Sequence, residues 1–320
     1  MIANARSPAL SSASFLDPQA LMRIRHLELR ARVVVEGFLS GLHRSPYHGF
    51  SVEFTEYRHY TPGDDLRYLD WRVFARSDRY FIKKFEDETN LRCHLLVDQS
   101  RSMTFGSTGY TKAHYAATLA ATLAYFLQLQ GDAVGLLTFD ERVREFLPAR
   151  HRAGHLRQLM LALEKPASGR ATDLITPLAR ITDLVHKRGL VAFVSDFLAP
   201  IATLERSLQA IGACGHELTV FQVLDPAELT LDFKEPAMFE DVESAEVRFI
   251  DPVTARQGYV RRLEAHCDAV RTTCQKLGIA CHRVATNQPL EFALFEFLQE
   301  RQRRGRHARR SSRPGPGRLP

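Results

Sequence analysis

The chain has 320 residues, of which 45% are apolar and 25% are charged, and these values are typical of a globular protein. They exclude collagen-like, disordered and disulfide-scaffold chains, and the length suffices for one large domain or two smaller ones. The formal charge of +6 is unevenly placed: residues 301–320 hold eight of the 43 basic side chains and no acid, so residues 1–300 carry 35 bases against 37 acids. The main part of the chain is therefore mildly acidic.

The first ninety residues do not show a regular α/β pattern. Residues 1–19 are rich in Ser, Ala and Pro, which predicts a flexible N-terminus. Apolar residues at helical spacing predict one amphipathic helix over 18–42. Residues 50–90 combine short strand-like pieces with a Pro-Gly turn at 61–65. We therefore expect an N-terminal helix and a small β appendage, together covering residues 20–89.

From residue 90 onward, short apolar runs alternate with helical segments. This alternation predicts an α/β fold with a doubly wound, mostly parallel, Rossmann-type sheet and helices on both faces, covering residues 90–302. The expected strands are 91–97, 133–139, 190–194, 217–223 and 279–284, and the expected helices are 111–130, 152–163, 173–186, 201–211, 255–276 and 290–303.

Two segments depart from this alternation. Residues 225–253 form an acidic, Pro-containing insertion, in which 229–233 and 247–250 are the expected arms of a hairpin. Residues 303–320 form an Arg-rich tail that we expect to be disordered. Its arginines favour weak contact with nucleic acid or another anionic surface. No aromatic side chain is interleaved with them, so specific nucleic-acid binding is not expected.

The five cysteines are odd in number and form no Cys-x-x-Cys pair, which is typical of reduced thiols in a cytoplasmic protein. Cys267, Cys274 and Cys281 recur every seven residues. This spacing permits a metal site, but we favour two thiols on one helix and a third on the strand that follows. The sequence shows no secretory signal and no apolar run long enough for a transmembrane segment.

The strongest chemical motif follows the first strand of the α/β part. Asp98, Ser100 and Ser102 stand at a spacing of two directly after an apolar run. In a doubly wound sheet, ligands bind at the carboxyl ends of the strands. An extended loop there directs all three oxygen-bearing side chains toward one point. The alternative is that they cap the helix that follows, since Asp and Ser are favoured caps.

Two later residues are expected at the same edge of the sheet. Thr172 precedes an expected helix, and Asp196 follows the apolar run at 190–194. Together with the first motif they form an all-oxygen set suited to Mg²⁺ or another hard divalent cation such as Mn²⁺. Thr172 alone is a typical helix N-cap, so it can serve either role.

The set Asp98-x-Ser100-x-Ser102, Thr172 and Asp196 resembles the metal-ion-dependent adhesion site of von Willebrand factor A domains. The resemblance covers residues 90 to about 300. It implies that Ser100, Ser102 and Thr172 contact the metal directly, and that Asp98 and Asp196 act directly or through water. It also implies an open coordination position for a carboxylate of a partner protein.

A second resemblance concerns residues 56–71, Glu-Tyr-Arg-His-Tyr-Thr-Pro-Gly-Asp-Asp-Leu-Arg-Tyr-Leu-Asp-Trp, with Ala75-Arg76 behind them. This stretch resembles the signature of the family called domain of unknown function 58, where it also precedes an A-type domain. Members are commonly encoded beside MoxR-type AAA+ ATPases, which implies a chaperone-like or assembly role. We expect the signature's charged residues to form an internal network of Arg–carboxylate pairs and its Trp to be buried. The members of that network are Arg58, Asp64, Asp65 and Arg67, and the Trp is Trp71.

These features predict a non-enzymatic, metal-dependent protein-interaction module. Its expected partner is a MoxR-type AAA+ ATPase or a client protein that offers an acidic side chain. The alternative is a metal-dependent phosphoesterase with Asp98 as the nucleophile. Ser100 stands where a haloacid-dehalogenase-type phosphatase requires a second Asp, and no Gly-x-x-x-x-Gly-Lys loop for ATP is present.

Overall fold

The structure is a computed structural model that describes residues 16–44, 56–59, 81–84, 91–167, 179–180, 183–185, 187–240 and 246–311. It contains two compact units. Helix α1 (Pro18–Met22) and most of α2 (Leu27–Arg44) belong to the same unit as a six-stranded sheet. The second unit contains β1 (Glu56–His59) and β2 (Phe81–Lys84), which pair in antiparallel fashion.

The six-stranded sheet confirms the expected fold class. Its strand order is β10-β7-β6-β3-β4-β5, so the first strand lies in the middle, as in Rossmann-type sheets. Five strands are parallel, and only the edge strand β5 runs antiparallel to its neighbour β4. The strands are β3 (Arg92–Asp98), β4 (Ala133–Phe139), β5 (Val143–Arg150), β6 (Leu190–Ser195), β7 (Glu217–Leu224) and β10 (Ala280–Ala285).

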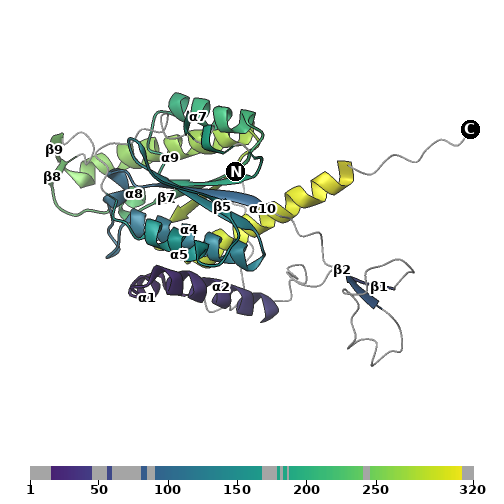
Figure 1. Cartoon of the computed structure of the whole chain (residues 1–320). Helices are drawn as coiled ribbons and strands as arrows, with labels where there is room; N and C mark the ends of the chain where they lie inside the picture. The colour runs from purple at the N-terminus through teal and green to yellow at the C-terminus, as the bar shows by residue number, and fades with distance from the viewer. Residues whose placement is uncertain are drawn as a thin grey trace, which may run out of the picture. The chain divides into compact units, whose positions relative to one another are not determined.

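Helices cover both faces of this sheet (Figure 1). On one face α7 (Ile201–Ala213) and α9 (Pro252–Lys276) pack on a core that includes Phe139, Phe193 and Phe197. On the other face lie α4 (Lys112–Leu129), α5 (His155–Leu163) and α10 (Leu290–Ser311), with α1 and α2 outside them. Because both faces are covered, the central strands are almost continuously buried, which explains their unbroken apolar runs.

The N-terminal helical region differs from the single helix expected over 18–42. The structure has two helices, α1 and α2, separated by residues 23–26. Helix α1 follows its N-cap Asp17, whose side chain accepts a hydrogen bond from the backbone N–H of Gln19. Helix α2 begins where Glu164 Oε1 accepts a hydrogen bond from the backbone N–H of Leu27 (3.1 Å). A side chain 137 residues away thus satisfies an N–H at the start of α2, and no local pattern reveals such a cap.

Strand β5 was not among the expected strands. It carries Pro148 and several charged side chains and is only partly buried, so it lacks a continuous apolar run. Proline is tolerated in a sheet at an edge strand, where β5 lies.

The insertion also differs from the expected hairpin. Its first expected arm, 229–233, is wrong: residues Pro226–Thr230 form the short helix α8. The hairpin consists instead of β8 (Ala237–Glu240) and β9 (Val247–Ile250), so the second expected arm is confirmed. Asp225 and Glu228 form a capping box with Pro226 at the first helical position, a sequence signal for a helix start.

Several other expectations can be compared with the structure. Cys267 and Cys274 lie on α9 and Cys281 lies on β10, as expected. Helix α10 continues to Ser311, beyond its expected end at residue 303. Most of the helix expected at 173–186 lies outside the described residues, as do Asp64, Asp65, Arg67 and Trp71. The side chain of Arg58, on β1, is also not described. Among the described helices, none has both the length and the apolar character needed to cross a membrane.

Candidate metal centre

The candidate site lies where two neighbouring parallel strands end. Asp98 is the last residue of β3, and Asp196 directly follows β6. The two strands are paired with Val97 opposite Val194, so their carboxyl ends lie side by side. Four of the five predicted ligands belong to the described residues, and two of those four, Asp98 and Asp196, come from these strand ends.

Asp98 is completely buried and both of its carboxylate oxygens accept hydrogen bonds. The backbone N–H of Ser100 donates to Oδ1 (2.8 Å), and the Ser195 hydroxyl donates to Oδ2 (2.6 Å). The first of these bonds closes a tight local turn that fixes the loop after β3. The second joins the loop to the end of β6.

The two serine hydroxyls of the motif converge. Ser100 Oγ and Ser102 Oγ are 3.1 Å apart, within hydrogen-bond distance. Ser100 is buried, whereas Ser102, at the start of the short 3-10 helix Ser102–Thr104, is partly exposed. The backbone N–H of Met103 donates to the carbonyl of Ser100, which keeps the loop compact. The pair therefore presents two adjacent oxygen donors with a route to solvent on the Ser102 side.

Asp196 is held by a buried lysine. Lys112 Nζ donates to Asp196 Oδ2 (2.8 Å) and to Glu228 Oε1 (2.6 Å), and the side chain of Lys112 is 0% exposed. The other oxygen of Asp196, Oδ1, accepts a hydrogen bond from the backbone N–H of Leu198 (3.2 Å). Both oxygens of Asp196 thus already have partners, so Asp196 suits contact with a cation through water.

The electrostatics of this edge favour an additional cation. Burial, together with the negative charge of Asp196, raises the pKa of Asp98 to about 7. Burial alone lowers the pKa of Lys112, but the charges of Asp196 and Glu228 outweigh it and leave this pKa raised. Burial raises the pKa of Glu228, although the charge of Lys112 opposes this. One ammonium thus stands among three carboxylates, of which Asp98 and Asp196 are buried and Glu228 is partly buried, and this leaves excess negative charge.

The donor set fits a hard divalent cation. It consists of carboxylate and hydroxyl oxygens, the ligands that Mg²⁺ prefers, and its negative charge is only partly balanced. Thr172, the fifth predicted ligand, lies outside the described residues. Within the described part of the chain, no group of three or more His, Cys, Asp or Glu is arranged to hold a metal ion, and the predicted set relies on serine hydroxyls instead.

Sequence reasoning missed three residues of the site: Lys112, Ser195 and Glu228. For Lys112 there was a signal, because it is the first residue of α4, where the helix dipole disfavours a positive charge. A lysine at that position requires compensating carboxylates. Glu228 was similarly marked by the capping box of α8.

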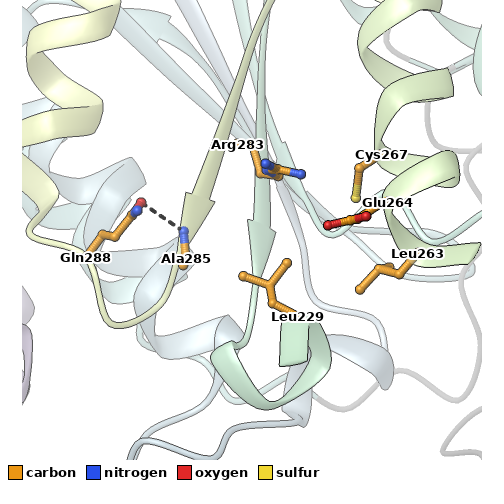
Figure 2. Close-up of a pocket in the computed structure, with 7 residues that line it drawn as sticks. All are labelled: Leu229, Leu263, Glu264, Cys267, Arg283, Ala285 and Gln288. Carbon is orange, nitrogen blue, oxygen red and sulfur yellow. Dashed lines mark hydrogen bonds between the residues drawn. The ribbon is translucent and has the colours of Figure 1, made fainter. Parts of the chain in front are cut away.

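A pocket of about 210 Å³ lies beside this edge, but it contains none of the predicted ligands. Figure 2 shows Arg283 of β10 facing Glu264 and Cys267 of α9, with Leu229 and Leu263 closing the space. Gln288 Oε1 accepts a hydrogen bond from the backbone N–H of Ala285 (3.2 Å). The pocket is therefore distinct from the candidate metal centre.

The strand order, the antiparallel edge strand and the oxygen-bearing loop after β3 define a von Willebrand factor A-like α/β protein. The family described as protein of unknown function DUF58 matches residues 56–269. The chain therefore belongs to the DUF58 family, as the signature at 56–71 predicted.

The chain is also similar to other proteins. The chain is 30% identical over 302 residues to uncharacterized protein Mb1516 of Mycobacterium bovis, covering 92% of this chain and 94% of the relative. Among solved structures, the conserved hypothetical protein BatB from Bacteroides thetaiotaomicron has a TM-score of 0.47 at 14% identity, over 66% of this chain and 99% of that one. The SpRpn10 VWA domain has a TM-score of 0.38 at 14% identity, over 64% and 93%.

Proposed function

We propose that this protein is a non-enzymatic interaction module that binds an acidic side chain of a partner protein through a divalent cation. The observation that supports the proposal is the convergence of Ser100 and Ser102, 3.1 Å apart, beside two buried carboxylates at adjoining strand ends. Such an edge has oxygen donors and excess negative charge, and it has one partly exposed side at Ser102.

In this proposal Mg²⁺, or Mn²⁺ in its place, is held by the hydroxyls of Ser100 and Ser102. Thr172 is the third protein ligand, and Asp98 and Asp196 act through water. The cation supplies a positive charge to which a carboxylate of the partner binds. The chain's own residues fix the loop: Asp98 accepts hydrogen bonds from Ser100 and Ser195, and Lys112 holds Asp196.

The partner in this proposal is a MoxR-type AAA+ ATPase, or a client protein that the two handle together in a chaperone-like assembly or maturation step. Membership of the DUF58 family supports it, because such ATPases are what the family resemblance implies as neighbours.

The phosphoesterase alternative gains no support from the geometry. Asp98 is completely buried and each of its oxygens accepts a hydrogen bond, whereas a nucleophile must reach its substrate. The site as described is better suited to holding a cation than to forming a covalent intermediate.

Capture of the partner with and without metal tests the proposal. The full chain is immobilised, the purified MoxR-type ATPase from the same organism is added, and retention is compared in Mg²⁺ and in EDTA. We expect retention in Mg²⁺ only, and its loss in Ser100→Ala. The control is Ser207→Ala, because Ser207 is a buried serine on α7, on the helical layer over one face of the sheet. Retention that EDTA and Ser100→Ala both leave unchanged contradicts the metal-dependent mechanism.

A further inference from the structure

A buried ammonium stands at the candidate metal centre, in a position that is costly for a lysine. Lys112 is the first residue of α4, after the N-cap Thr111, and its side chain is fully buried. Both burial and the positive end of the helix dipole disfavour a cation there. The arrangement persists because Asp196 and Glu228 each accept a hydrogen bond from Nζ, at 2.8 and 2.6 Å.

The two carboxylates that hold Lys112 are themselves fixed. Asp196 Oδ1 accepts from the backbone N–H of Leu198, and Gln222 donates to the carbonyl of Asp196 (3.1 Å). Glu228 Oε2 accepts from the backbone N–H of Asp225 (2.9 Å), as part of the capping box of α8. The ammonium is therefore held by rigid groups from two elements and is not a loose surface ion pair.

The ammonium of Lys112 therefore already balances the charge of Asp196, the carboxylate after β6 that a divalent cation needs. We propose that Lys112 is a built-in counter-cation, which lowers the affinity of the edge for divalent cations and keeps the edge folded when no cation is bound. The proposal rests on the metal centre of the proposed function. It deepens that function, because a weakly held cation is bound firmly only when the partner's carboxylate adds its own negative charge.

Two consequences distinguish this role from a purely structural ion pair. Removing the ammonium leaves Asp196 and Glu228 without their counter-charge, so the edge then gains affinity for a divalent cation. The same change makes stability depend on that cation, because bound metal replaces the missing charge. Removing a carboxylate has the opposite effect on affinity, because Lys112 then repels the metal with less compensation.

The test measures binding of Mn²⁺ to the full chain by calorimetry in four forms: wild type, Lys112→Met, Glu228→Gln and the double variant. We expect Lys112→Met to bind Mn²⁺ about tenfold or more tightly than wild type, and Glu228→Gln to bind more weakly. The double variant removes one charge of each sign and is expected to stay within about threefold of wild type. Opposite directions in the two single variants exclude a general loss of structure as the cause.

Thermal unfolding gives a second readout if Lys112→Met is poorly stable. We expect this variant to melt well below wild type in EDTA and to recover most of the difference in Mn²⁺, whereas wild type shifts little. If wild type binds Mn²⁺ and Lys112→Met binds no more tightly and is not rescued, the role of Lys112 is overturned and the metal centre stands. If neither form binds Mn²⁺ or Mg²⁺, the metal centre itself is overturned, and this inference with it.

Discussion

Ser195 Oγ donates a 2.6 Å hydrogen bond to Oδ2 of Asp98, and this bond joins the ends of the two central strands β6 and β3. The same hydroxyl oxygen accepts a hydrogen bond from the backbone N–H of Phe197 (3.1 Å). Phe197 has a left-handed backbone (φ 55°), which is uncommon for a residue with a side chain. Its ring is buried against Phe193, with centroids 4.7 Å apart, and its carbonyl accepts a hydrogen bond from His266 of α9. Ser195 therefore stabilises both Asp98 and the turn that carries Asp196.

We predict that Ser195→Ala destabilises the fold by about 1–3 kcal/mol, because a buried carboxylate and a buried N–H each lose a partner. Urea unfolding measures the change. The control is Thr272→Ala, which removes an exposed hydroxyl from α9 and is expected to cost less than about 0.5 kcal/mol. Equal effects in the two variants contradict a special role for Ser195.

Gly135 on β4 offers a test of packing within the sheet. A Cβ at this position would lie 2.8 Å from the backbone nitrogen of Ala149 and 2.9 Å from the carbonyl oxygen of Leu147, both on β5. Backbone atoms in a paired strand cannot move aside cheaply, so we predict that Gly135→Ala costs about 1–3 kcal/mol.

The matched control for this variant is Gly212→Ala. Gly212 lies in α7, and a Cβ there has no neighbour within 4 Å. Alanine is the better helix former, so the same substitution is expected to stabilise the protein, by roughly 0.5–1 kcal/mol. Urea unfolding of both variants should therefore give changes of opposite sign, and a loss of stability in both contradicts the predicted difference between the two sites.

The C-terminal arginines give a prediction about salt. Deletion of residues 305–320 removes five arginines, Arg306, Arg309, Arg310, Arg313 and Arg318. We expect the full chain to bind random-sequence duplex DNA weakly through counterion release, and the deletion to abolish this binding. The logarithm of the DNA-binding constant falls as the logarithm of the salt concentration rises, and each phosphate contact that is lost makes this slope less steep by roughly 0.9. Fluorescence anisotropy across a salt series measures it, and a truncated chain that binds equally well refutes the role of the tail.

The sequence predicted most of the fold but only part of the candidate site. Buried parallel strands require long apolar runs, so β3, β6 and β7 were recognisable, and Asp98 and Ser100 followed from the strand end. Lys112 was not predicted as part of the site, because its contacts depend on how α4 and α8 begin over the strand ends. The partners of Lys112 lie 84 and 116 positions away, so the local signal at the start of α4 indicates that a partner is needed but not which residue it is.

The strand prediction in the insertion was wrong for a different reason. The residues Asp225-Pro226-Ala227-Glu228 carry a complete helix-start signal, and α8 begins there. The apolar pattern at 229–233 was instead interpreted as a strand. Where apolar periodicity is short and ambiguous, the capping residues are the more reliable local signal, because they satisfy specific backbone N–H groups.

Buried His94 on β3 predicts sensitivity to acid. Burial, with smaller contributions from the charges of His216 and Arg92, lowers its pKa from 6.5 to about 4. The folded state therefore favours the neutral imidazole, whereas the unfolded chain takes up a proton near pH 6.5. Stability is expected to fall as the pH drops from 6.5 to about 4, by up to about 3 kcal/mol at and below pH 4, because each pKa unit corresponds to 1.36 kcal/mol.

Replacement of His94 by Gln removes the titrating group, so in urea unfolding His94→Gln should lose less stability than wild type over this pH range. His151→Gln, at an exposed histidine, is the control and should keep the wild-type dependence. A pH dependence that His94→Gln leaves unchanged would mean that the acid sensitivity arises from other groups.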